Sequence, residues 1–577
     1  MKTSSRKMPL KPYLEAVREH CRGLSKEELI AAVIEMAEKI PIGGRADFLD
    51  KIRGPASRPS HRHGKTGKDF TKSLLDRIAV LQEEIEERIR SIEDGDYWEE
   101  PDSWETDYYG EEEPGYLSAE QTEELENLFL ETGSIFLDGQ LKKACQLYRA
   151  LFDLVDENGE THECLSRDSI DLREERARYC RCVYETADPK KRVQSVLESI
   201  GVEAPLNDFR LDLAYERFPM IQDVVDARPG ELADWEIFLR AWEKTLSQCR
   251  GDRAAVLRIE AIQKLEGIDG VSRLAREWKS GQPRAYLFWI QCLENLGDWR
   301  SMVDVTQEAL EALPKGGFRE QAAEYMTTAA ARLGNPELVL RGRRERFLSL
   351  PRETNLIALL GEATKQNVRS RELDTAIASL HADRKNKAQQ GNLRIRMLLM
   401  AGRFREAFEE GQGEKSLGWS HGKGGLLFAS ILSILTRNSS EAVIIKSLLE
   451  RYCGTPGYWD EDYDGAKSSD VYKEIVTGLK SVQTDEPEAL KYWAWANRIG
   501  RARIEAIVSG QFRDAYEAAA RVLGALAECC VLANKKEEAR SLLHEFIVVK
   551  FPRHSAFRRE AKLVASGSNL IRELRAL

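Results

Sequence analysis

The sequence predicts an all-α protein, a degenerate α-solenoid of stacked helical hairpins preceded by a small helical region at the amino terminus. Three observations predict this fold. Apolar residues return at spacings of three and four along most of the chain, as on one face of a helix. No segment shows the sustained alternation of apolar and polar residues that marks a strand. Glycines and prolines recur 37 residues apart within 283–351, a period typical of stacked two-helix units.

Length and composition exclude some classes of protein. A chain of 577 residues is too long for one compact core, so several domains or an elongated array are expected. Charged residues make up 32% and hydrophobic residues 42%, which leaves ample apolar surface to bury. The net charge of -10 argues against a general nucleic-acid binder, because such a protein needs a basic face to displace counterions from phosphates.

The sequence predicts neither a secretory signal nor a membrane span. The amino terminus carries positive charges without an apolar core, and the apolar stretch 426–435 is shorter than the roughly 18 residues that cross a bilayer. The ten cysteines are scattered without a C-x-x-C pair, which favours reduced thiols. We therefore expect a cytoplasmic protein with no membrane partner.

Residues 1–92 are expected to form the small helical region. Ser25 and Glu28 make a capping box at the start of one helix. The apolar residues of that helix are expected to share one face: Leu29, Ile30, Val33, Ile34 and Ala37. A basic stretch at 54–68, rich in glycine and proline, predicts a loop. The long helix that follows carries apolar residues at Leu74, Ile78, Leu81, Ile85, Ile89 and Ile92.

Residues 93–118 are expected to link this region to the solenoid at 119–577. Within 93–116 the chain holds eleven acidic residues, six aromatic residues and no Lys or Arg. Like-charge repulsion and two prolines oppose an ordered element, so we expect an acidic linker able to fold onto a basic partner. The first helices of the solenoid are expected at 119–137, 140–156, 167–186, 189–200, 209–226, 231–247 and 253–265.

Two consecutive hairpins carry the repeat. Gly297 and Gly334 each stand at a turn between two helices, and Pro314 and Pro351 each end the second helix. Glycine accepts the backbone conformation of a tight turn, and proline cannot continue a helix. Weaker echoes of the turn occur at irregular spacing, at Gly139, Gly402, Gly510 and Asn534. The irregular spacing indicates a degenerate array.

This pattern resembles the tetratricopeptide repeat family, which implies a tetratricopeptide-like α-solenoid. With Gly297 on the family's turn glycine, the packing positions of the first hairpin are Tyr286, Trp289, Ile290, Leu293, Met302, Thr306 and Ala309. Met302 stands where the family has alanine. In the second hairpin, the corresponding positions of the second helix are Val339, Arg343 and Arg346.

A second resemblance is to the helical-repeat regions that accompany SWIM zinc-finger domains in bacterial proteins. The stretches that carry it are LSKEELIAAVIEMAEK, SLGWSHGKGGLLFASILSIL and FRDAYEAAARVLGALAECCVLANKKEEARSLLHEFIVVKFPRHSAFRREAKL. The zinc motif of those proteins, C-x-C followed by C-x-H, is absent. Cys180 and Cys182 form a C-x-C on nearly opposite sides of a predicted helix, so we expect buried cysteines and no zinc site.

Other chemical motifs are few. HGKTGK at 63–68 lacks the preceding strand and the first glycine of a phosphate loop. DEDYDG at 460–465 matches the opening of a calcium loop, with Asp460, Asp462 and Asp464 as candidate metal ligands. Its twelfth position is Val471, where a bidentate Glu is needed. No catalytic motif is found, so we expect no enzyme and no cofactor.

The carboxyl end is locally basic, with Lys550, Arg553, Arg558, Arg559, Lys562, Arg572 and Arg575. Its aromatic residues suited to base stacking are sparse, Phe551 and Phe557 only. A solvated helix face, contact with nucleic acid, and docking of the acidic segment 93–116 are all open interpretations.

The sequence favours a non-catalytic helical-repeat scaffold or adaptor that binds a protein or peptide partner. In tetratricopeptide repeats the first helix of each hairpin lines the binding groove. The resemblance therefore implies these contact residues: Arg284, Gln291, Glu294, Asn295, Thr328 and Arg332. One alternative is a regulatory subunit that sequesters a transcription factor or effector in a bacterial defence or signalling system. Another is a calcium-dependent or enzymatic protein that uses the loop at 460–470.

Overall fold

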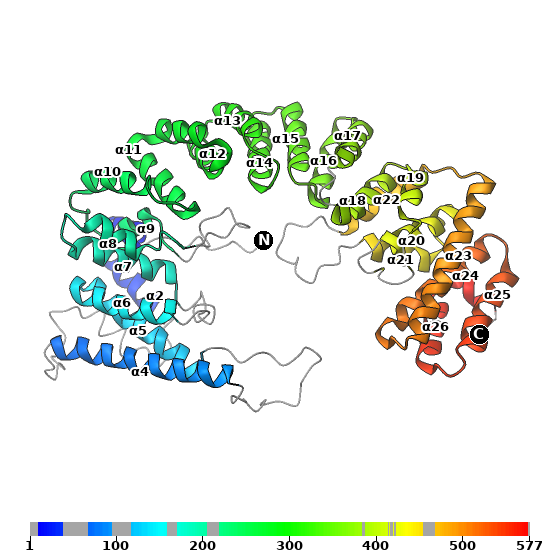
Figure 1. Ribbon diagram of the computed structural model, residues 1–577, viewed down its shortest axis with the longest axis horizontal. Helices are drawn as coiled ribbons and strands as arrows, with labels where there is room; N and C mark the ends of the chain where they lie inside the picture. Colours follow the sequence, from blue (N-terminus) through cyan, green and yellow to red (C-terminus); the bar gives the residue numbers. More distant parts are fainter. Residues whose placement is uncertain are drawn as a thin grey trace. The chain divides into compact units, whose positions relative to one another are not determined.

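The computed structural model describes residues 10–38, 67–94, 117–157, 170–204, 218–382, 387–413, 415, 419, 423–453 and 468–574. Throughout these ranges every regular element is a helix, and no strand is formed (Figure 1). The predicted all-α class is therefore confirmed for the described part of the chain. The chain divides into two compact units, Met1–Phe288 and Trp289–Leu577, each with hydrophobic clusters of its own.

The first unit holds α1 (Leu10–Gly23), α2 (Lys26–Glu38), α4 (Gly67–Glu93), α5 (Ala119–Leu137), α6 (Leu141–Glu157), α7 (Leu172–Thr186), α8 (Arg192–Ser199), α9 (Ile221–Asp226), α10 (Trp235–Leu246) and α11 (Asp252–Trp278). The division between the units falls inside α12 (Arg284–Leu296).

The second unit continues with α13 (Trp299–Ala312), α14 (Gly317–Arg332), α15 (Pro336–Ser349), α16 (Glu353–Lys365), α17 (Arg369–Ala382), α18 (Lys387–Met400), α19 (Phe404–Gly411), α20 (Lys423–Leu435) and α21 (Val443–Cys453). It ends with α22 (Ser468–Lys480), α23 (Glu486–Ser509), α24 (Tyr516–Leu532), α25 (Lys536–His544), a π-helix η6 (Glu545–Lys550), α26 (Ser555–Ser566) and α27 (Asn569–Arg572).

The capping box at the start of α2 is formed as predicted. The Ser25 hydroxyl accepts from the Glu28 N–H at 3.3 Å, and the Glu28 carboxylate accepts from the Ser25 N–H at 2.7 Å. The five apolar residues predicted to share one face of this helix are not equally buried. Leu29 is half-buried, but Ile30 and Ile34 are 51% and 53% exposed. Each residue turns a helix by about 100°, so Ile30 and Ile34 point away from the side that Leu29 buries.

The long helix α4 packs as its spacing predicted. Leu74, Ile78, Leu81 and Ile85 are buried where α4 meets α5 and α6. Arg77 adds ion pairs to two carboxylates of α5, Glu124 at 2.9 Å and Glu131 at 2.8 Å.

Two other helices of the first unit differ from their predicted ranges. Residues 209–217 of the helix expected at 209–226 lie outside the described ranges; residues 218–220 are not helical, and α9 begins at Ile221. The helix expected at 253–265 continues to Trp278 as α11, but Gly267 breaks it with φ 68° and ψ -152°. The helix therefore kinks close to its predicted end, at Gly267, and does not stop there.

One backbone motif closes the hairpins. The N–H of Gly139 donates to Phe136 O at 3.0 Å, and the next N–H, of Gln140, donates to Ile135 O at 3.1 Å. The same two hydrogen bonds recur around Gly297, Gly334 and Gly402, and all four glycines have φ between 66° and 78°. The left-handed conformation lets the chain satisfy the last carbonyls of one helix while it turns back into the next.

Residues other than glycine make this turn elsewhere. Asn367, Arg437, Gln511 and Asn534 have φ between 50° and 60° and form the same pair of hydrogen bonds. At Gly510 the sequence placed the turn one residue too early. The N–H of Gly510 still donates to Ala506 O at 3.1 Å, so α23 continues and Gln511 takes the left-handed conformation.

Five of these turns follow one another, at residues 297, 334, 367, 402 and 437. Their intervals are 37, 33, 35 and 35 residues. They join α12 to α13, α14 to α15, α16 to α17, α18 to α19 and α20 to α21 (Figure 1). The repeat is therefore longer and more regular than the sequence indicated, because two of its turns carry Asn or Arg in place of glycine.

The packing positions predicted for the first of these hairpins are all buried. Those predicted for the second helix of the next hairpin were wrong. Val339, Arg343 and Arg346 are only half-buried, while Leu340 and Phe347 enter the core.

Gly342 explains this difference in register. A Cβ atom on Gly342 would lie 2.4 Å from Thr327 Oγ1 and 3.2 Å from Ala323 O. The helices α14 and α15 therefore cross at Gly342, and the neighbours of Gly342 determine which side chains enter the core.

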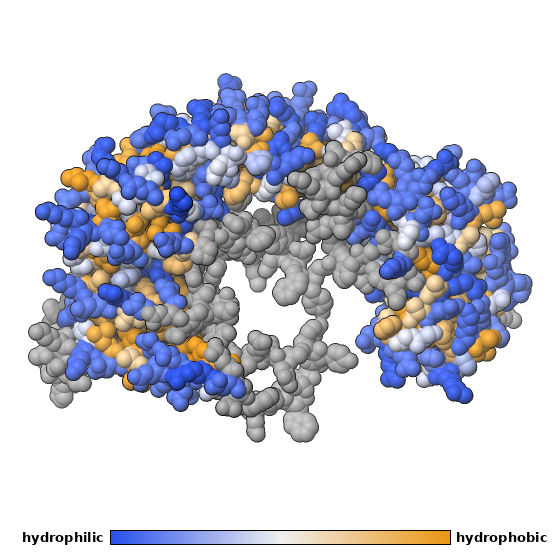
Figure 2. Space-filling model, viewed as in Figure 1, coloured by the Kyte–Doolittle hydropathy of each residue, from blue (hydrophilic) through white to orange (hydrophobic). Residues whose placement is uncertain are grey.

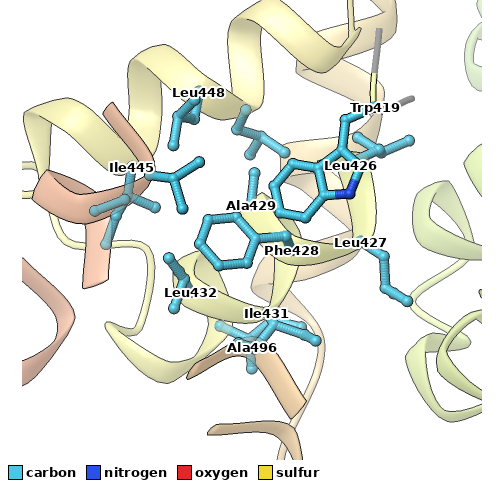
Figure 3. Close-up of a cluster of buried hydrophobic side chains, with 14 of the residues drawn as sticks. Trp419, Leu426, Leu427, Phe428, Ala429, Ile431, Leu432, Ile445, Leu448 and Ala496 are labelled. Atoms are coloured by element: carbon cyan, nitrogen blue, oxygen red, sulfur yellow. The ribbon is translucent and has the colours of Figure 1, made fainter. Parts of the chain in front are cut away.

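The helix α20 forms the centre of the later core. All of its residues from 424 to 434 are buried. Figure 3 shows Phe428 and Leu432 beside Ile445 of α21, and Ile431 beside Ala496 of α23. A helix that is apolar on every side has to be surrounded in this way.

Candidate protein-binding surface

Four of the six predicted contact residues lie on α12. Asn295 is exposed, and Gln291 and Glu294 are half-buried on the same side of the helix. Arg284 is only 3% exposed. Its side chain therefore offers almost no surface to a partner, in contrast to the other three.

The helix α14 supplies the other two predicted residues and continues the side formed on α12. The Gln291 side-chain amide donates to the Tyr325 hydroxyl at 2.9 Å, so the first helices of consecutive hairpins are joined directly. Thr328 is half-buried one turn after Tyr325, and Arg332 is exposed at the end of the helix. We call the following set the first-helix surface: Gln291, Glu294, Asn295, Tyr325, Thr328 and Arg332.

Arg332 also fixes the edge of this surface. Its guanidinium lies 5.6 Å from the ring centroid of Trp299, at the start of α13. This cation–π contact ties the end of α14 to the preceding hairpin. Arg332 therefore has a defined position while its charge stays exposed.

An ion-pair network backs the surface from α15. Glu324 accepts from Arg343 at 2.9 Å and from Arg346 at 2.7 Å. Glu320 accepts from Arg346 at 3.0 Å and from the Asn355 amide of α16 at 3.0 Å. Arg343 and Arg346, which depart from the family's pattern, thus pair with glutamates of α14, and Asn355 extends the network to α16.

A second ion pair fixes α15 to α17. Glu372 is 1% exposed and accepts from Arg344 at 2.6 and 2.8 Å. The hydrogen bonds from Arg344 lower the pKa of Glu372 despite its burial. A buried carboxylate held by a bidentate arginine restricts motion between the two hairpins.

Sequence reasoning missed Tyr325 and Trp299. Tyr325 lies three residues before Thr328, so it falls on the same side of the predicted helix. That spacing was a sufficient signal for Tyr325. The sequence contains no comparable signal for Trp299, because its role depends on the contact with Arg332 in the next hairpin.

The described ranges contain no candidate site for a metal ion. Asp460, Asp462 and Asp464 lie outside them, and within them no cluster of His, Cys, Asp or Glu is arranged to hold a metal ion. Cys180 and Cys182 are buried as expected, and burial raises the pKa of the Cys180 thiol to about 11. The basic loop is also outside these ranges up to residue 66, as is the acidic linker at 95–116.

The described helices also do not meet the requirements for a membrane span. In the part of the chain that the structure describes, no helix combines the length and the apolar character needed to cross a bilayer.

Comparisons with known proteins add little to this description. No family model matches the chain, and no curated protein matches it. Among solved structures, a "Circular tandem repeat protein with novel repeat topology and enhanced subunit contact surfaces" is 15% identical and covers 88% of this chain and 98% of its own. Its TM-score is 0.14, so this likeness supports no conclusion. The helical-repeat architecture rests on the hairpins and turns described above.

Proposed function

We propose that this chain is a non-catalytic helical-repeat scaffold or adaptor, and that the first-helix surface binds a protein or peptide partner. The observation that carries the proposal is the hydrogen bond between Gln291 and Tyr325, which joins consecutive first helices. The network on α15 restricts motion behind them. A surface ordered before binding loses less conformational entropy when a partner docks.

The chemistry of the surface favours an extended segment as the partner. Gln291, Asn295, Tyr325 and Thr328 are uncharged hydrogen-bonding side chains, and Glu294 and Arg332 add one charge of each sign. An extended backbone brings N–H and C=O groups that need such partners. The tetratricopeptide resemblance assigns ligand binding to the same helices.

A charge exchange on the surface tests the proposal. The variant Glu294→Lys with Arg332→Glu keeps the net charge but inverts both charged positions. We expect proteins captured by the full chain from its native host to fall about tenfold or more in abundance with this variant, as for loss of central interface contacts. Quantitative mass spectrometry of the captured proteins provides the measurement.

The matched control makes the same exchange on second helices. Asp304 of α13 and Arg341 of α15 are both exposed, so Asp304→Lys with Arg341→Glu makes the same exchange of charge at two solvent-facing positions. This control should retain the captured proteins. Equal retention by both variants, or equal loss, would assign binding to some other surface.

A further inference from the structure

A second surface of the second unit lies on α26, which packs against α24 and α27. Phe557, Ala561 and Ala565 are buried on one side of this helix. The opposite side carries Arg559 and Lys562, both exposed, and Leu563, which is 65% exposed. Arg553, just before the helix, is also exposed. We call Arg553, Arg559, Lys562 and Leu563 the outer face of α26.

The cations of this face differ from many arginines of the second unit, which have a carboxylate partner. Carboxylates lie within 4.0 Å of Arg319, Arg343, Arg344, Arg346, Arg369, Arg394, Arg396, Arg403, Arg405, Arg501, Arg521 and Arg540. Among the described residues, none lies within that distance of Arg553 or Lys562. Arg559 reaches only its neighbour Glu560, at 3.2 Å, and its side chain stays 80% exposed.

An ion pair as exposed as Arg559 with Glu560 neutralises little of the local potential. The outer face of α26 is therefore a positive area on a chain whose net charge is -10. Such an area attracts acidic groups and orients them as they approach. Leu563 follows Lys562 and lies one helical turn after Arg559, so it provides an apolar contact beside these two cations.

We propose that the outer face of α26 binds an acidic segment of a partner protein, with an apolar side chain of that segment on Leu563. Clusters of Arg and Lys recognise acidic motifs through charge-assisted hydrogen bonds. Single-stranded nucleic acid fits less well, because its bases need aromatic platforms. Phe551 and Phe557, the nearest aromatic residues in sequence, are 6% and 0% exposed.

Fluorescence anisotropy with the full chain tests this directly. The probe is a fluorescein-labelled peptide of twelve residues, made of Glu and Asp with two Leu, at about 50 mM salt to limit screening. We expect binding by the wild type. Arg559→Glu with Lys562→Glu should weaken binding about tenfold or more, since two attractive contacts become repulsive. Leu563→Ser should weaken it by about threefold, from the loss of an apolar contact.

Matched controls separate a local site from general electrostatics. Arg300 and Arg341 are exposed cations of α13 and α15, so Arg300→Glu with Arg341→Glu makes the same change in charge elsewhere. Leu490 of α23 is 57% exposed and serves as the control for Leu563 through Leu490→Ser. Both controls should bind the peptide within about twofold of the wild type.

Three results would overturn the proposal. The first is no binding of the peptide by the wild type. The second is equal weakening by the Arg300 and Arg341 control, which would show attraction without a site. The third is tighter binding of a single-stranded DNA of twelve nucleotides that is lost in the Arg559 and Lys562 variant. The milder Arg559→Gln with Lys562→Gln provides the same comparison if charge reversal disturbs folding, as judged by circular dichroism.

Discussion

Single buried carboxylates hold helices that lie far away in the sequence. Glu260 of α11 accepts from the N–H groups of Ile221 at 2.9 Å and Gln222 at 2.7 Å, at the start of α9. In the second unit, Glu528 of α24 accepts from Ile444 at 3.0 Å, at the start of α21. The first turn of a helix leaves N–H groups without partners, and these carboxylates supply them from another element.

Glu260 gives the first unit a defined dependence on pH. Burial raises its pKa to about 7, although Lys264 and the two N–H groups favour its charged form. Burial also raises the pKa of Glu175 to about 7. Groups with a raised pKa in the folded state contribute stability below their unfolded pKa, and this contribution is lost as pH rises through the folded pKa.

We therefore expect α9 to be more stable near pH 5 than near pH 8, with most of the loss around the raised pKa of about 7. Hydrogen exchange of peptides from α9, corrected for the intrinsic effect of pH, measures this. Glu260→Gln resembles the protonated carboxyl group and should flatten the dependence. Protection that increases with pH in the wild type would contradict the assignment.

The contact residues illustrate how much of a site a sequence can predict. The alignment to the tetratricopeptide family assigned Gln291, Glu294 and Asn295 to the binding side of a helix, and these three residues lie on one side of α12. The same alignment assigned Arg284, which is buried. An alignment gives the side of a helix on which a residue lies, but burial depends on what the rest of the chain places over it.

At the scale of elements, spacing predicted helices well and their turns less well. Glycines marked the turns at 139, 297, 334 and 402, because glycine adopts the left-handed conformation without strain. Asn367 and Arg437 make the same turn at a cost of roughly 1 kcal/mol or more. The two hydrogen bonds of the turn and the packing of the hairpins offset this cost, and neither is visible in the residue type.

The sequence also did not indicate where α14 and α15 cross. The crossing point depends on which residue of α15 lies closest to α14. Gly342 has Thr327 N at 3.0 Å from an added Cβ, whereas Gly361 of α16 has nothing within 4 Å. Alanine in an open helical position stabilises by about 0.5–1 kcal/mol relative to glycine.

Two glycine substitutions therefore have opposite expected effects. Gly361→Ala should stabilise the protein by about 0.5–1 kcal/mol, because its Cβ meets open space. Gly342→Ala should destabilise it by roughly 1–3 kcal/mol, because α15 has to move off the backbone of α14. Urea denaturation of both variants gives the comparison. A stabilised Gly342→Ala variant would mean that the two helices do not cross there.

At the scale of the whole molecule, the sequence predicted stacked hairpins but underestimated their regularity. The domain boundaries expected after residues 92 and 118 stay predictions. The structure divides into two compact units, and the boundary between them falls within α12. The proposed adaptor function depends on the second unit, where hairpins joined at 297, 334, 367, 402 and 437 follow one another. Hairpins of this kind bury their apolar sides only against each other.

Distances between hairpin turns test this stacking most directly. Spin labels attached to a genetically encoded ketone-bearing residue leave the native cysteines unmodified. Pairs of labels at residues 296 and 333, 296 and 366, and 296 and 437 sample turns one, two and four hairpins apart. Pulsed electron paramagnetic resonance should give distances that increase in that order, each narrowly distributed. A 296–437 distance equal to or shorter than the 296–333 distance would contradict a stack of hairpins.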